Sequence, residues 1–165
     1  MPVLELKIAN GTATVRQIMA AVFSSVTYLP FIWRLNRYIK ESESKTMNYY
    51  SKKHESDFKQ TLERIDPNNL SVLSAVYLLT ANVQLLRRVQ NQVEKNGIRF
   101  DRMNLGPVDE KAYTLSCCAK DLYLGTKHIT IADLADEQLI SPKMFGIICN
   151  ALAICRFGIG VLNQN

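Results

Sequence analysis

The segment from Leu70 to Thr80 is apolar on almost every side of a helix. Its apolar side chains do not follow a single stripe, since they include Leu70, Val72, Leu73, Val76, Tyr77 and Leu79. A helix that is hydrophobic all round is stable only where other elements surround it. The sequence therefore predicts a fold in which further helices pack around a central, fully buried helix over residues 70–80.

Capping signals elsewhere in the chain predict the surrounding helices. Each signal is a short polar residue followed by apolar residues at helical spacing. We expect helices from Ser51 to about Ile65, from Asn82 to Asn96-Gly97, from Asp109 to Gly125, and from Ser141-Pro142 to about Phe157. Thr130 and Asp133 are expected to start a further, short helix. Residues 98–107 are expected to form a loop with a short strand at 98–100. The predicted fold class is mainly α, a compact multi-helix domain of six to eight helices.

The N-terminus carries a different pattern. Apolar residues alternate over Val3–Ile8 and Asn10-Gly11 follows, which predicts a short N-terminal extended segment. Residues 12–15 fit a return strand, and they also fit the start of a helix that Thr14 and Gln17 cap. We favour the helix.

A polar stretch over residues 41–46 divides the chain. At 165 residues the chain is near the usual size of one domain, and its 7 glycines and 5 prolines leave little material for long linkers. We predict an N-terminal appendage at 1–46, with an apolar helix and a basic amphipathic helix, and a helical core domain at 47–165.

Residues 17–33 carry no charge, so a membrane-associated protein held by residues 15–40 is one interpretation. Gln17 and several hydroxyl side chains dilute the segment, and Pro30 interrupts it. A buried core helix fits this composition better. Membrane contact is therefore not expected, and the chain is predicted to be cytoplasmic.

From Pro30 onwards, aromatic and basic residues share a short amphipathic helix. Aromatic and arginine side chains contribute most to the energy of protein interfaces. The candidate contacts are Phe31, Trp33, Arg34, Arg37, Tyr38 and Lys40. We expect them to bind a protein partner or a second copy of the chain.

The reactive residues do not form a recognisable catalytic or metal set. Cys117, Cys118, Cys149 and Cys155 lie in apolar helical context without a Cys-x-x-Cys pair, which predicts free, buried thiols in a reducing compartment. His54 is expected at the exposed start of a helix, in a structural or capping role, and His128 at the surface. We therefore predict a protein that is not an enzyme and needs no metal or cofactor.

Residues 130–157 have the rhythm of a helix-turn-helix, so a DNA-binding regulator is the alternative function. Lys143, Asn150 and Arg156 are the side chains that could reach nucleic acid. They sit on a very apolar helix, however. The net charge of +5 is also concentrated in residues 1–46, which leaves the larger part nearly balanced and makes nucleic acid the weaker prediction.

Four short patterns connect the chain to other proteins. They are Tyr50-x-x-x-His54-x-x-x-Phe58, Ala75–Thr80, Ala119-x-x-Leu122-Tyr123-x-Gly125 and Ala151-x-x-x-Cys155-Arg156-Phe157. Through them residues 50–157 resemble a family of small uncharacterised helical proteins from Gram-positive bacteria and their phages. The resemblance implies a helical domain in a bacterial or phage cytoplasmic setting, and it carries over no active site.

These observations together predict a non-enzymatic protein-binding module. If it is encoded by a phage or mobile element, as the resemblance implies, it would bind or inhibit a host protein.

Overall fold

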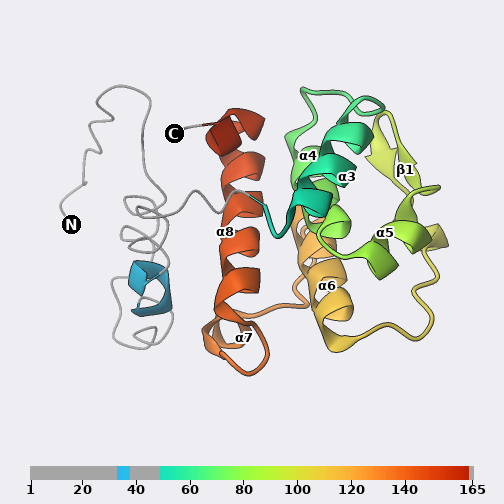
Figure 1. Ribbon diagram of the computed structural model, residues 1–165. Helices are drawn as coiled ribbons and strands as arrows, with labels where there is room; N and C mark the ends of the chain where they lie inside the picture. The colour runs from blue at the N-terminus through green and yellow to red at the C-terminus, as the bar shows by residue number, and fades with distance from the viewer. Residues whose placement is uncertain (1–32, 38–48, 164–165) are drawn as a thin grey trace, which may run out of the picture.

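Helix α4 (Leu70–Thr80) is the centre of the fold. The computed structural model describes residues 33–37 and 49–163, and in it α4 packs against α3 (Lys52–Leu62), α5 (Val83–Val89), α6 (Glu110–Leu124) and α8 (Pro142–Phe157) (Figure 1). Every residue from Val72 to Thr80 is buried. The prediction of a central, fully buried helix is therefore confirmed.

Polar residues are tolerated inside α4 because the helix itself satisfies them. The Ser74 hydroxyl donates to the Ser71 carbonyl at 3.0 Å, and the Thr80 hydroxyl donates to the Val76 carbonyl at 2.9 Å. A buried hydroxyl without an acceptor would cost about 1–3 kcal/mol. These bonds let α4 carry hydroxyl groups without a loss of that size.

The predicted caps are in place. Ser51, Asn82, Asp109, Thr130 and Ser141 each accept a hydrogen bond from the first turn of the helix that follows. Thr130 and Asp133 form a complete capping box at α7 (Ile131–Ala135). Gly125 ends α6 with a φ of 70°, a conformation that side chains other than glycine rarely adopt. Within the described residues the fold is mainly helical, with seven helices, as the sequence predicts.

The prediction of one helix from Asn82 to Asn96-Gly97 is wrong. Helix α5 ends at Val89, and β1 (Val93–Glu94) and β2 (Gly97–Ile98) form an antiparallel hairpin. The strand predicted at 98–100 thus lies over Gly97–Ile98, and a 3₁₀ helix, η2 (Phe100–Arg102), follows it.

Contacts outside the hairpin explain why this segment turns back. Its tip accepts two hydrogen bonds from the turn before α4, from the Asp66 N–H to the Lys95 carbonyl at 2.9 Å and from the Asn69 side chain to the Asn96 carbonyl at 3.3 Å. Gly97 faces Tyr123, since a Cβ at this position would lie 2.9 Å from the Tyr123 hydroxyl. Asn96-Gly97 therefore serves a close packing contact and does not end a helix.

The N-terminal part is described only over residues 33–37, which are helical as predicted. Leu35 is buried and belongs to the same hydrophobic core as α4 and α8. Figure 1 shows α8 standing between these residues and α3–α6. Three other predicted features lie outside the described residues: the extended segment, residues 17–32 of the apolar helix, and the linker over 41–46. The division into 1–46 and 47–165 therefore stays a prediction.

We expect the fold to depend on the packing around α4. Leu79→Ala removes a side chain that is fully buried, and should lower the free energy of unfolding by about 2–5 kcal/mol. Leu124→Ala is the matched control, since Leu124 is 54% exposed, and should change it by less than about 0.5 kcal/mol. Urea denaturation followed by circular dichroism measures both, and equal losses would contradict this description of the core.

Candidate functional site

Arg34 connects residues 33–37 to the core through hydrogen bonds. Its guanidinium donates to the carbonyls of Leu134 and Ile140, which lie at the two ends of the connection between α7 and α8. The same group lies 4.9 Å from the ring centre of Phe145 on α8 and 3.9 Å from the Glu137 carboxylate. The sequence predicts Arg34 as a contact for a partner, whereas the structure buries it inside the fold with 4% of its surface exposed.

Trp33 and Arg37 remain at the surface beside this anchor. Trp33 is 59% exposed, and the Arg37 guanidinium lies 5.7 Å from its ring centre. Arg37 also forms an ion pair with Glu137 at 3.3 Å. We call Trp33, Arg37 and Glu137 the Trp33 surface. Phe31, Tyr38 and Lys40, the other predicted contacts, lie outside the described residues.

Arg34, which lies beneath the Trp33 surface, keeps its charge through nearby carboxylates. Burial lowers the pKa of Arg34, while Glu137 and Asp136 act in the opposite direction and favour its charged form. Glu137 therefore serves both arginines, one inside the fold and one at the surface. The Glu137 carboxylate compensates for the repulsion between these two guanidinium groups, since it lies 3.9 Å from that of Arg34 and 3.3 Å from that of Arg37.

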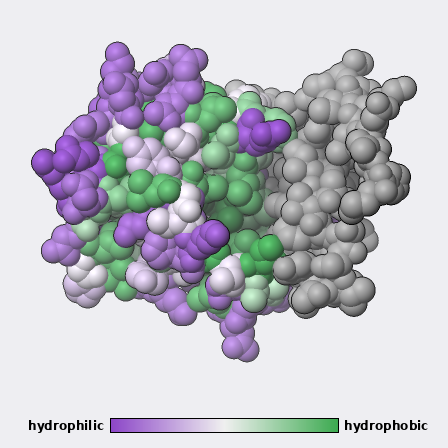
Figure 2. Space-filling view, turned by 180° about the vertical axis from the view of Figure 1, so that it is seen from behind, coloured by the Kyte–Doolittle hydropathy of each residue, from purple (hydrophilic) through white to green (hydrophobic). Residues whose placement is uncertain are grey.

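Helix α6 also exposes two large apolar side chains. Tyr113 and Leu124 are 57% and 54% exposed, and their spacing of three helical turns places them on one side of the helix. Figure 2 shows, on the reverse of the molecule, that apolar residues gather across the middle of that face, with hydrophilic residues around its edge. Neither of these exposed side chains is predicted from the sequence.

Residues 130–157 do form two helices, but α8 is a core helix. Nine of its residues are buried, from Met144 to Ile154. Asn150 donates to the Tyr77 hydroxyl at 3.2 Å, and the Lys143 ammonium lies 4.4 Å from the ring centre of Tyr50. A recognition helix needs an exposed face to enter a groove of DNA. Of the three predicted nucleic-acid contacts, Asn150 and Lys143 thus contact tyrosines of the fold, while Arg156 is exposed. This geometry does not favour the DNA-binding alternative.

His54 is buried, and the prediction that it lies at an exposed position is wrong. Its Nδ1 accepts from the Tyr50 N–H at 2.9 Å and its Nε2 lies 2.8 Å from the Tyr77 carbonyl, so the ring is neutral with the proton on Nε2. The ring centre of Tyr77 is 4.7 Å away. Burial lowers the pKa of His54 to about 4, although the bond to Tyr77 partly opposes this shift.

The cysteines are free, as the sequence predicts, and three of the four are buried. Burial raises the pKa of the Cys118 and Cys149 thiols to about 12, which keeps them protonated. A protonated thiol is neither a nucleophile nor a metal ligand. Cys155, which is partly exposed, departs from the predicted burial.

Asp121 organises the turn after α6. Burial opposes its ionisation, but hydrogen bonds from the N–H groups of His128 and Ile129 and from the side chains of His128 and Thr126 outweigh it and lower its pKa. His128 lies at the surface, as the sequence predicts. The pair of Asp121 and His128, with an Nδ1–Oδ1 distance of 2.8 Å, thus shapes the path of the chain from α6 to α7.

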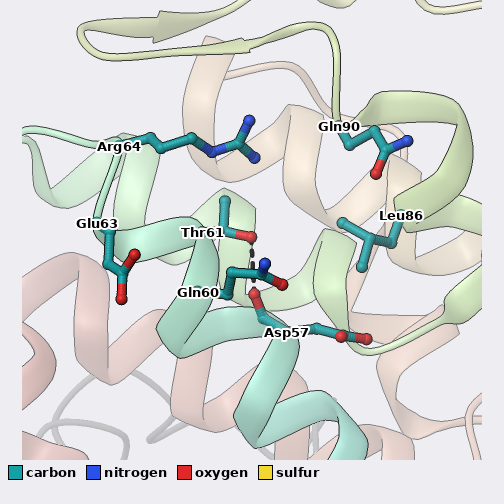
Figure 3. Close-up of a pocket in the computed structure, with 7 residues that line it drawn as sticks. All are labelled: Asp57, Gln60, Thr61, Glu63, Arg64, Leu86 and Gln90. Atoms are coloured by element: carbon teal, nitrogen blue, oxygen red, sulfur yellow. Dashed lines mark hydrogen bonds between the residues drawn. The ribbon is translucent and has the colours of Figure 1, made fainter.

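A polar pocket between α3 and α5 is the site that sequence reasoning missed. Its volume is about 320 Å³, and it is lined by Asp57, Gln60, Thr61, Glu63, Arg64, Leu86 and Gln90 (Figure 3). Residues 57, 60, 61 and 64 have the spacing of one helical face. The polar residues at this spacing were the feature of the sequence that could have indicated a site. The sequence does not show, however, that α5 lies opposite them and forms the other wall of the pocket.

The described residues contain neither a metal-ligand cluster nor a membrane-spanning helix. No group of three or more potential ligands is placed to hold a metal ion in this part of the chain. No helix there is long and apolar enough to cross a bilayer, while most of the 15–40 segment lies outside the description.

Comparison with known proteins found no matching protein family, no matching curated protein and no matching solved structure. The resemblance of residues 50–157 to proteins of Gram-positive bacteria and phages therefore stays a prediction.

We expect Arg34 to stabilise the fold and Arg37 to contribute little. Arg34→Met leaves the carbonyls of Leu134 and Ile140 without their donor, and should lower the free energy of unfolding by roughly 3 kcal/mol. Arg37→Met removes a half-exposed ion pair and should cost less than about 1 kcal/mol. Urea denaturation measures both, and an Arg34→Met protein as stable as Arg37→Met would show that the buried contacts are not formed.

His54 should make the protein sensitive to acid. Because its pKa is about 4 in the folded chain and near 6.5 when unfolded, the unfolded chain binds the extra proton first as the pH falls. Stability is fully present above pH 6.5 and should decrease by about 3 kcal/mol between pH 7 and pH 4 through this residue.

Denaturation curves across that pH range test the assignment. His54→Gln should be less stable at pH 7 but should lose the part of the pH dependence that His54 causes. His128→Gln should retain it. A His54→Gln protein with the wild-type pH dependence would exclude His54 as its source.

Proposed function

We propose that this chain is a non-enzymatic protein-binding module that contacts its partner through the Trp33 surface. The observation that carries the proposal is an exposed tryptophan held beside an arginine on a helix that is itself anchored in the core. Tryptophan and arginine are the residue types most enriched among the contacts that dominate interface energies. The solvent-exposed position of Trp33 fits this role.

The Trp33 surface is ordered before any partner binds. Glu137 holds Arg37 at 3.3 Å, and Arg34 fixes the helix to the α7–α8 connection. Ordering side chains on binding costs about 0.5–1.5 kcal/mol for each flexible side chain. A surface that is already arranged avoids part of this cost, which supports a binding role.

The buried reactive groups have structural roles, which also supports binding over catalysis. His54 uses both ring nitrogens to connect Tyr50 with Tyr77, and the buried thiols of Cys118 and Cys149 are held protonated. Following the resemblance of residues 50–157, we propose a cytoplasmic setting in a bacterium or its phage. A host protein is then the proposed partner, and self-association through the same surface is the alternative.

A photo-crosslinking residue, p-benzoylphenylalanine, placed at position 33 tests the proposal. In cells of a Gram-positive host it should give a discrete adduct, whose mass separates a host protein from a second copy of this chain. The yield should fall at least about fivefold when Arg37→Glu is added, because the charge reversal places two carboxylates side by side on the surface.

The same residue at position 113 is the comparison, because Tyr113 is equally exposed on α6. Adducts from position 113 alone would move the binding surface to α6 and contradict the proposal. An adduct at position 33 that is indifferent to Arg37→Glu would also contradict it.

A further inference from the structure

The pocket between α3 and α5 places opposite charges at its two ends. Figure 3 shows the Asp57 carboxylate at the α3 side below Leu86, while the Arg64 guanidinium extends across the other end toward Gln90. Glu63 points away from the other side chains. The lining thus offers an acceptor, a cation and two amides around one space.

Asp57 is incompletely paired. It is 8% exposed, and its Oδ1 accepts from Lys53 at 3.0 Å, but its Oδ2 has no hydrogen-bond partner among the described residues. Lys53 itself is largely in solvent, with 61% of its side chain exposed. A buried carboxylate is stable only when donors compensate for the lost hydration. A cationic donor that enters the pocket would give Oδ2 the hydrogen bond that Lys53 gives only to Oδ1.

Arg64 is a cation that lacks an anionic partner among the described residues. It is an exposed residue whose side chain forms no ion pair with any residue that the structure describes. Its planar guanidinium favours a carboxylate, which it can bind through two parallel hydrogen bonds. Asp57 lies on α3 and Arg64 lies two residues beyond its end, so they are seven residues apart, which is about 10 Å at the rise of a helix. A ligand that meets both groups must therefore carry its cation several bonds away from its carboxylate.

We propose that this pocket binds a free basic amino acid, with the side-chain cation at Asp57 and the α-carboxylate at Arg64. Gln60 and Gln90 supply amide oxygens for the α-ammonium group. The volume of about 320 Å³ lies at the small end of the range for ligand pockets, which suits a molecule of this size. This site is separate from the Trp33 surface, and the proposal goes beyond the proposed function without depending on it.

Three ligands test the proposed roles of Asp57 and Arg64 on the full chain, because two of them each differ from L-arginine in a single group. L-Arginine has both charges, agmatine lacks the carboxylate, and L-citrulline replaces the guanidinium with a neutral urea of the same shape. In an NMR titration, L-arginine should shift the amide signals of residues 57–64 and 86–90. Agmatine and L-citrulline should each bind about tenfold more weakly, because each loses one charge-assisted contact.

Two variants connect each difference to its residue. Arg64→Gln should bind L-arginine and agmatine equally, and Asp57→Asn should bind L-arginine and L-citrulline equally. Glu55→Gln is the matched control on α3, because Glu55 does not line the pocket, and it should bind as the wild type does. Circular dichroism establishes that each variant is folded before titration.

Equal binding of all three ligands by the wild type would overturn the proposal, as would the absence of shifts at residues 57–64. Retention of the wild-type preference in both variants would overturn it as well. None of these outcomes depends on the crosslinking at position 33, so each proposal can fail alone.

Discussion

The burial of α4 on all sides is the constraint on which the rest of the structure depends. A helix without a polar face must be covered by several neighbours, and α3, α5, α6 and α8 each supply part of that cover. Its burial also fixes where polar groups can lie. The Tyr77 carbonyl meets His54 and the Tyr77 hydroxyl meets Asn150, so two flanking helices are oriented by one residue of the central helix.

Local signals in the sequence were sufficient for most helix boundaries. Capping depends on residues two or three positions apart, so Asn82, Asp109, Ser141 and the Thr130–Asp133 box could be identified without knowledge of the tertiary structure. The same is true of Gly125. The all-round hydrophobicity of residues 70–80 likewise needed no partner to be recognised, because it is a property of the segment alone.

The wrong predictions concern residues whose burial or conformation is determined by contacts with residues far away in the sequence. His54 follows a helix cap among charged neighbours, which suggests exposure, but it is buried and its Nε2–H donates a hydrogen bond to the Tyr77 carbonyl. Asn96-Gly97 resembles a helix end, yet Asp66 and Tyr123 determine its conformation. Arg34 belongs to a basic helix, and nothing near it predicts that the α7–α8 connection would take its guanidinium. Likewise, the pocket at Asp57 exists only because α5 lies opposite α3.

The anchoring of Arg34 has a consequence for how the chain is made. Its acceptors, Leu134 and Ile140, follow it by 100 and 106 residues, and Phe145 follows later still. Synthesis proceeds from the N-terminus at about 5–20 residues per second, so Arg34 and Leu35 leave the ribosome several seconds before their binding site exists. During that interval both side chains face solvent or a chaperone. Arg34 and Leu35 are thus synthesised early and reach their native contacts late.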